Sequence, residues 1–369
     1  MSLQSAAEQI VEPLDGCRRS SLRWLVQSDF ARRTIAHRDR RIATIACASV
    51  LAAGFGAVYF PVLLFALGPV LFGVAHIAAD VRYLVLRRKL ARWWQNTVWG
   101  GCAALIALRV LEELGLLRHA ERIEFATGGA FIGVALFAAL RERGSPGRAL
   151  IAGALLLAAT SGAMSQPKLT RYVFLHAHNL VALLLWAVLF RANKRWLLAP
   201  LALIIAAAVA LASGVLAEQT LASPFAASFH LHVFTVSDWV APFADPRWAI
   251  GVTTAYLFLQ SVHYSTWLRL IPQEEQRGAG TPTFRMSVRS LFSDLGASGV
   301  GAVLLALAAV LVGACINLHR ARGLYLSLAT FHGYLELSLF AYFWVRGGSG
   351  APGRPAAGAA GPNRVPIAA

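Results

Sequence analysis

Apolar stretches of about 17 to 25 residues recur from the start of the sequence to near its end, each long enough to cross a hydrocarbon layer of about 30 Å. Hydrophobic residues make up 57% of the chain and charged residues only 14%. A water-soluble fold would therefore leave too much apolar surface uncovered. The sequence predicts an all-α fold, a polytopic transmembrane helical bundle of about ten spans.

The predicted spans divide the chain into three regions. An Arg-rich segment, 1–41, precedes a transmembrane helical domain, 42–346, and a tail rich in Gly, Pro and Ala, 347–369, which we expect to be disordered. Within the domain we place the spans near 42–60, 63–86, 96–117, 124–140, 149–164, 172–190, 197–217, 248–268, 292–316 and 324–345.

The basic residues gather in alternate loops between these spans. The net charge is +16, and 25 Lys and Arg residues fall in the segments on one side of the predicted spans, against seven on the other. The positive-inside rule makes the richer side cytoplasmic, so both termini are predicted there. We expect an integral protein of a bacterial inner (cytoplasmic) membrane that contacts membrane lipid and does not bind nucleic acid. The sequence leaves the oligomeric state open.

One loop, 218–247, carries more aromatic residues than a free linker would. We expect it to lie in the outer interface or to re-enter the protein. Its two histidines, His230 and His232, are interpreted as polar residues at a wet interface, and a part in the site is left open.

Histidines inside the predicted spans are the main functional signal. An ionisable ring in hydrocarbon is costly, so it normally faces the interior of the bundle and finds a partner. All of them fall on even-numbered predicted spans, which run in the same direction and can face one cavity. These residues are His76, His176, His178, His263 and His332.

Two of these histidines have a carboxylate four residues later, as in His76–Asp80 and His332–Glu336. That spacing puts both side chains on one face of a helix. The acid can then orient the imidazole or act as a ligand. The candidate catalytic residues are Asp80, Glu336 and Tyr264, which follows His263.

Neutral imidazoles that converge in a dry cavity favour a transition metal such as iron, copper or zinc. His176 and His178 point about 200° apart on a regular helix, so we favour His178 over His176. Counting about 1.5 Å per residue puts His76 and His263 about 20 Å below the outer surface, but His178 and His332 only about 10 Å below it. The sequence therefore leaves open whether these histidines form one site or two.

Three segments contain a histidine in a recognisable setting: the run from Gly73 to Asp80, the aromatic-rich run Tyr256–Trp267 and the pair Phe331-His332. The first resembles the G-x-P-H-G-x-x-D motif of the Brp/Blh-type membrane β-carotene dioxygenases, and the other two resemble that family's later histidine motifs. The resemblance implies a ferrous iron held by histidines from separate spans, which cleaves a polyene with dioxygen.

The first hypothesis is therefore an iron-dependent membrane oxidoreductase or oxygenase with a multi-histidine site, acting on a lipophilic, carotenoid- or lipid-like substrate. Two alternatives stay open. One is a haem-binding electron carrier with two axial histidines. The other is a transporter or proton-coupled permease with an intramembrane His/Asp/Glu site.

Overall fold

The computed structural model describes residues 2–88, 90–190, 194–242, 245–275 and 283–347. In these residues nearly all secondary structure is helical, and the strands are the short antiparallel pair β1 (Ala227–Ser228) and β2 (Leu231–His232). The all-α prediction is confirmed. The predicted disordered tail lies, from residue 348 on, outside the described residues.

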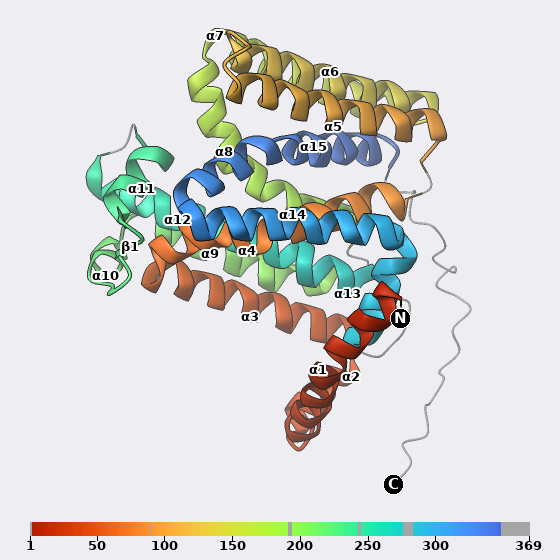
Figure 1. Ribbon diagram of the computed structural model, residues 1–369, viewed down its shortest axis with the longest axis vertical. Coiled ribbons are helices and arrows are strands. Elements are labelled where there is room, and N and C mark those ends of the chain that lie inside the picture. The colour runs from red at the N-terminus through yellow and green to blue at the C-terminus, as the bar shows by residue number, and fades with distance from the viewer. Residues whose placement is uncertain (1, 89, 191–193, 243–244, 276–282, 348–369) are drawn as a thin grey trace.

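The long helices run side by side, with α10 (Ala217–Leu221), β1 and α11 (Val233–Val240) near one end of the bundle and α1 (Leu3–Leu25) at the opposite end (Figure 1). The long helices are α3 (Arg38–Tyr59), α4 (Pro61–Asp80), α5 (Arg92–Glu113), α6 (Ala120–Arg141), α7 (Pro146–Ser165), α8 (Pro167–Leu185), α9 (Leu198–Ala212), α12 (Pro246–Ser265), α14 (Phe284–Ala329) and α15 (Phe331–Val345). Shorter helices are α2 (Asp29–Ala36), α13 (Ile271–Glu275) and the 3₁₀ turn η3 (Lys194–Leu197).

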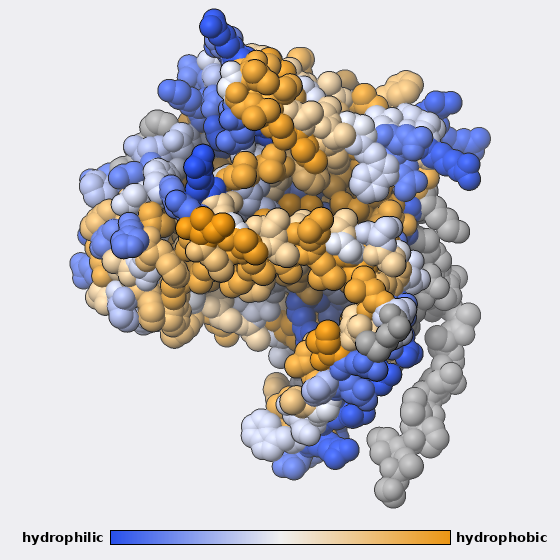
Figure 2. All heavy atoms as spheres, viewed as in Figure 1, coloured by the Kyte–Doolittle hydropathy of each residue, from blue (hydrophilic) through white to orange (hydrophobic). Residues whose placement is uncertain are grey.

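Seven helical segments of the described chain are long and apolar enough to cross a membrane. They are Arg38–Tyr59, Pro61–Leu86, Ala120–Arg141, Pro146–Ser165, Pro167–Phe190, Arg195–Ala212 and Phe284–Val345. Hydrophobic side chains cover much of the outward face of α14 (Figure 2), including the exposed Leu305, Val312 and Ile316. Such a surface is suited to lipid contact.

Proline sets the start of several helices. Pro61, Pro146, Pro167 and Pro246 each lie in the first turn of a long helix. Backbone N–H groups in the first turn of a helix have no acceptor within the helix, so a proline there costs no hydrogen bond. Its fixed φ also suits a helix. The short connections between α3 and α4, and between α7 and α8, follow from this, since each new helix begins within two residues of the previous one.

The last helix pair departs from a simple hairpin. α14 is interrupted at Gly296, where φ is +69°, and at Asn317, where φ is −153° and ψ is 97°. The segment after Asn317 is therefore a separate short helix that leads into α15. Beyond this break Arg322, Tyr325 and His332 are each at least nine-tenths buried.

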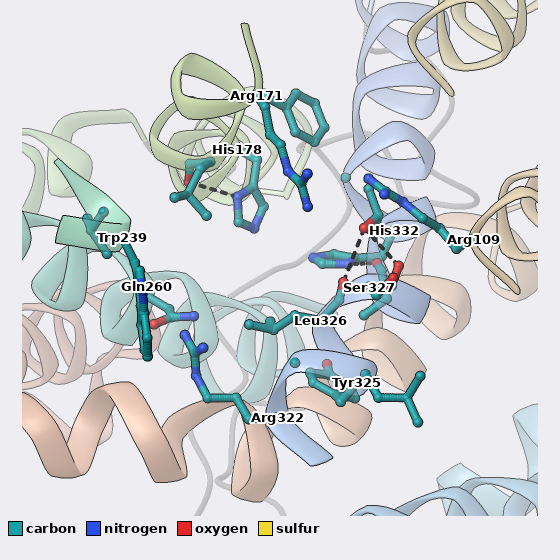
Figure 3. Close-up of a pocket in the computed structure, with 18 of the residues that line it drawn as sticks. Arg109, Arg171, His178, Trp239, Gln260, Arg322, Tyr325, Leu326, Ser327 and His332 are labelled. Carbon is teal, nitrogen blue, oxygen red and sulfur yellow. Dashed lines mark hydrogen bonds between the residues drawn. The ribbon is translucent and has the colours of Figure 1, made fainter. Parts of the chain in front are cut away.

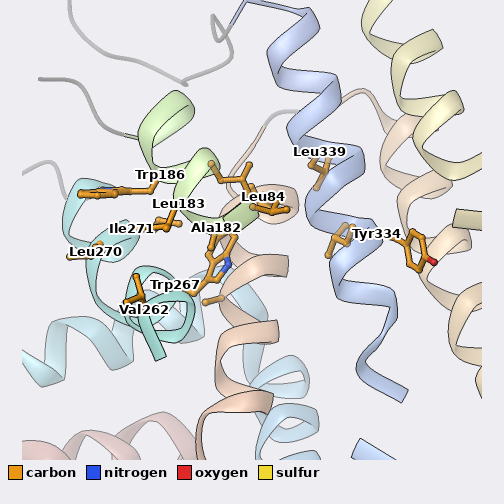
Figure 4. Close-up of a cluster of buried hydrophobic side chains, with 14 of the residues drawn as sticks. Leu84, Ala182, Leu183, Trp186, Val262, Trp267, Leu270, Ile271, Tyr334 and Leu339 are labelled. Carbon is orange, nitrogen blue, oxygen red and sulfur yellow. The ribbon is translucent and has the colours of Figure 1, made fainter. Parts of the chain in front are cut away.

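Three helices widen into π-helical turns at equivalent ends: η1 (Val81–Leu86) follows α4, η2 (Trp186–Phe190) follows α8, and η4 (Thr266–Leu270) follows α12. A hydrophobic layer joins these turns (Figure 4), with the fully buried Leu84, Trp186 and Trp267 among its members. Single π turns in α-helices frequently occur at functional sites. Here each turn directly follows one of three helices, α4, α8 and α12, that carry candidate histidines.

The Arg-rich segment is largely helical, and its first helix, α1, packs along the start of α14. Asp15 is 5% exposed and accepts hydrogen bonds from the backbone N–H groups of Phe284 at 2.7 Å and Arg285 at 3.1 Å. It thereby caps the first turn of α14. Glu8 adds an ion pair, since Arg289 donates to it from Nε at 3.0 Å and from Nη2 at 2.8 Å.

Replacing Asp15 by Ala should release α1 from α14, because two helix N–H groups lose their acceptor. Loss of such a cap costs about 1–2 kcal/mol, and tryptic cleavage at Arg19 and Arg23 should accelerate about 5- to 30-fold. The matched control is Glu12→Gln, at an exposed residue whose contact to Arg285 is 3.4 Å long. Equal cleavage rates in D15A and E12Q would contradict the capping role.

The hydrogen bond from Arg289 lowers the pKa of Glu8 from 4.5 to about 2. A carboxyl with a depressed pKa in the folded protein contributes stability above its ordinary pKa and loses that contribution as the pH falls toward the lowered value. The contact between Glu8 and Arg289 should therefore persist at pH 5 and weaken only in strong acid.

Candidate metal centre

Three histidines from three helices converge in the interior of the bundle. His76 of α4, His263 of α12 and His332 of α15 each offer one ring nitrogen, and these nitrogens all lie within 4.8 Å of one another. The ring centroid of His76 is 4.8 Å from that of His332 and 5.3 Å from that of His263. Their exposed fractions are 2%, 1% and 9% for His76, His263 and His332.

A fourth ring completes the group. His178 of α8 has its ring centroid 5.1 Å from that of His263 and 5.4 Å from that of His332. Its ring extends from α8 toward the cavity that His332 also lines (Figure 3). The four rings, from α4, α8, α12 and α15, form one group.

Backbone carbonyls orient three of these rings. Nδ1 of His76 lies 3.3 Å from the Phe72 oxygen, Nδ1 of His178 lies 3.3 Å from the Leu175 oxygen, and Nδ1 of His332 contacts the Ala329 oxygen. A carbonyl oxygen can only accept, so each Nδ1 carries the hydrogen and donates. Each Nε2 therefore presents its lone pair, which is the form that binds a metal.

Those nitrogens lack protein partners. Nε2 of His76, Nε2 of His332 and both ring nitrogens of His263 are buried without a hydrogen bond to any described residue. A buried polar atom without a partner is costly, and native structures seldom leave one unexplained. Several such atoms in one group indicate a ligand.

Two buried carboxylates lie beside the rings, as the spacing in the sequence predicts. Glu336 is fully buried; Trp267 donates from Nε1 to its Oε1 at 2.6 Å, and Nε2 of His263 is 3.5 Å from the same oxygen. Asp80 is also fully buried, and neither of its oxygens has a hydrogen-bond partner among the described residues. No Lys or Arg of the described chain forms an ion pair with either acid.

A cavity of about 1550 Å³ reaches this group from the surface. Its inner part is lined by His76, His178, His332 and Tyr264, and the ring of Tyr264 lies 4.9 Å from that of His76. Gln260 donates from Nε2 to the Tyr264 hydroxyl at 3.2 Å. Tyr264 is thus held at the wall next to the histidines.

The structure does not bring His176 into the group, although it was among the candidate ligands. Its Nε2 donates to the Val240 carbonyl at 3.0 Å, and its ring packs against Tyr256 with centroids 5.4 Å apart. The reason is the spacing of two residues on a regular helix, which turns His176 away from His178.

The aromatic loop folds against the bundle as α10, β1, β2 and α11, and Asp238, Trp239 and Val240 line the cavity. Its histidines stay apart from the group. Nδ1 of His232 accepts from the Phe234 N–H at 3.3 Å, and His230 has a positive φ of 59° in the turn between the strands.

Two lining residues were missed at the level of sequence. Arg322 and Tyr325 follow the break at Asn317, and both are at least nine-tenths buried. Tyr325 packs so closely on Gly73 that a Cβ at that glycine would overlap the Tyr325 ring. Gly73, one turn before His76, is the feature of the sequence that could have indicated this close contact.

The donor set fits a divalent transition metal. Imidazole nitrogens suit iron, copper and zinc, and two buried carboxylates without a cation would be balanced by two positive charges. Converging lone pairs, unpartnered buried atoms and adjacent acids all point to the same position. Comparison with protein-family models, with curated proteins and with solved structures finds no match to this chain.

Proposed function

We propose that this chain is an integral membrane oxidoreductase that binds one ferrous ion through His76, His263, His332 and His178. The observation that carries the proposal is the convergence of imidazole nitrogens from separate helices, with Nε2 of His76 and His332 left unpartnered in the protein. Three converging ring nitrogens, with the ring of His178 beside them, favour a single ion over haem, whose iron takes two axial protein ligands.

Asp80 and Glu336 support the same proposal through charge. Each carboxylate is fully buried, and burial of an isolated charge is strongly unfavourable. A divalent ion among the rings offsets both charges. Glu336 also orients His263 from one side while Trp267 fixes the carboxylate from the other.

The remaining parts of the site suit oxidation of a lipophilic molecule. Bound ferrous iron would supply the activation of dioxygen. The protein supplies a cavity open at the surface, and Tyr264, Phe174 and Trp239 of its lining offer apolar contact to a hydrocarbon chain. A carotenoid- or lipid-like substrate agrees with the resemblance in the histidine segments.

We further propose ten spans in a bacterial inner membrane, with both termini cytoplasmic. Support comes from the arrangement of the helices. α1 and the end of α15 lie at the end of the bundle opposite to α10 and α11 (Figure 1). The segments between the predicted spans are richest in Lys and Arg at that end.

The direct test is the metal content of the full chain purified in detergent. We expect about one iron per chain by elemental analysis, as for a single closed site, and no Soret band in the visible spectrum. With β-carotene or oleate in mixed micelles as the probe, oxygen uptake should depend on iron. Wild-type protein that contains no metal after growth in iron-supplemented medium would refute the proposal, and an intense Soret band would assign the histidines to haem.

A further inference from the structure

Arg322 is a buried cation at the cavity wall without an anionic partner. Only 8% of the residue is exposed. Its Nε donates to the backbone oxygen of Phe65 at 2.7 Å, and its Cζ lies 3.5 Å from the centre of the Phe65 ring. Both contacts are with a neutral residue, and no carboxylate of the described chain forms an ion pair with Arg322.

The charged end of Arg322 is directed into the cavity. Its guanidinium reaches from the segment after Asn317 toward Gln260 (Figure 3). Nη1 and Nη2 donate to no described residue, so the two N–H groups needed for a paired contact remain available.

The other buried cation of the cavity, Arg109, is already paired with Glu112 and Glu124. Arg171 is exposed and donates to Glu121 at 2.9 Å. Lys168 and Arg320 also line the cavity, but both are exposed to solvent. Among the described lining residues, Arg322 is therefore the cation that is both buried and without an acid.

A buried charge is normally paired, because removing it from water is costly and a partner offsets part of that cost. We propose that the cavity binds a single-chain amphiphile by its carboxylate, with Nη1 and Nη2 of Arg322 donating to the two carboxylate oxygens. Arginine suits this contact because its planar fork matches a carboxylate.

The surroundings favour a carboxylate over a phosphate. The nearby donors are neutral: the amide of Gln260 and the buried Tyr325 hydroxyl, which has no described partner. A phosphate monoester carries about two charges at neutral pH, and the described wall has no second buried, unpaired cation. The aromatic lining and the cavity volume of about 1550 Å³ leave room for a long hydrocarbon chain.

The position of Arg322 also determines which part of the ligand meets the histidines. His332 lines the same cavity and follows Arg322 by ten residues, across the junction between α14 and α15. A ligand held by its carboxylate at Arg322 presents a carbon well along its chain to the metal position. This assignment names the substrate class of the proposed oxidoreductase and rests on that function, but carboxylate binding can be measured without metal.

The test uses tritiated oleate and the full chain in phosphatidylcholine nanodiscs. Wild-type protein should bind oleate saturably, and Arg322→Gln should weaken binding about tenfold or more, the effect of a lost charge-assisted contact. Arg322→Lys, which retains the charge without the fork, should be intermediate. Arg320→Gln is the matched control, because it removes an exposed cation two residues away, and it should change affinity less than about twofold.

Unlabelled competitors identify the head group. Methyl oleate and oleyl alcohol, which carry the same chain without a carboxylate, should compete at least about tenfold more weakly than oleate. Equal competition by methyl oleate, equal affinities of R322Q and R320Q, or absence of oleate binding would overturn the proposal. Stronger competition by oleoyl lysophosphatidate would overturn it in favour of a phosphate head group.

Two further measurements separate this proposal from the proposed function. Thermal unfolding shows whether R322Q remains folded, and R322K supplies a second variant if it does not. His263→Ala removes a member of the triad that is not among the residues lining the cavity, so it should abolish metal binding but leave the affinity for oleate within about twofold. Oleate binding that depends on Arg322 in a protein without metal would support the carboxylate site while refuting the oxidoreductase.

Discussion

Replacing any one of His76, His263 or His332 by Ala should lower metal affinity by more than about 100-fold, because removal of a ligand should exceed the 10- to 100-fold effect of losing a group that only orients one. The ligand nitrogens of these residues lie within 4.8 Å of one another. His178→Ala should have a smaller effect, since its ring lies beside this triad with centroids 5.1 Å and 5.4 Å from two members.

His176→Ala is the matched control for this series. It removes an imidazole from the same helix, two residues from His178, but the ring it removes donates to the Val240 carbonyl. We expect full metal content and a stability loss of about 1 kcal/mol, the usual effect of one hydrogen bond. Elemental analysis and titration of the apo-protein with ferrous iron would measure the metal affinity of each variant. A metal loss in H176A equal to that in H332A would show that the triad is not the binding site.

Glu336→Gln should reduce metal affinity by about 10- to 100-fold while keeping the shape of the site. Glutamine retains an oxygen that can accept from Trp267 Nε1, whose bond to Glu336 is 2.6 Å long. What the variant removes is a buried negative charge beside the rings. The apo form of E336Q should melt no lower than apo wild type, because the wild-type carboxylate has no cationic partner in the described chain without metal.

Glu124→Gln is the control for burial of a carboxylate. Glu124 is 4% exposed, accepts from the Tyr334 hydroxyl at 3.0 Å and is paired with Arg109. This variant should lose stability by about 1–3 kcal/mol, because it leaves part of the Arg109 charge unbalanced, yet bind metal as wild type does. Melting curves with and without iron distinguish the two variants. An unchanged iron-induced shift in E336Q would exclude charge balance as the function of Glu336.

Much of the fold could be predicted from apolar lengths and prolines. The predicted spans at 42–60, 63–86 and 149–164 correspond to α3, to α4 with η1, and to α7. Each is bounded by a residue with a local effect, such as Pro61 or Pro146, so these boundaries do not depend on tertiary contacts. The predicted spans 96–117 and 248–268 correspond to α5, which ends at Glu113, and to α12 with η4, but neither is among the seven segments long and apolar enough to cross a membrane.

The convergence of the histidines could be predicted only in part. Depth counted from the sequence separates His332 from His76, because the last predicted span begins near 324. In the structure α14 breaks at Asn317. His332 then lies 15 residues beyond the break, just past the junction of α14 and α15, and His76 lies 15 residues beyond Pro61.

Arg322 shows why the cavity wall was missed. Its place next to Arg320 suggested a charged outer loop, and charge alone does not distinguish a solvated arginine from a buried one. Burial of Arg322 comes from the ring and carbonyl of Phe65, 257 positions earlier in the sequence. Contacts over such a separation are set by how the helices pack, which no local pattern encodes.

The carbonyls that fix the imidazoles of His76, His178 and His332 belong to the same helix or to the turn just before it, three or four residues earlier. Each helix can therefore prepare its own ring before any tertiary contact forms. Packing of the helices against one another then brings these oriented rings together at the metal position. Metal occupancy would then report how well the bundle is assembled, and a substitution far from the rings that separates α4 from α12 would empty the site without altering a single ligand.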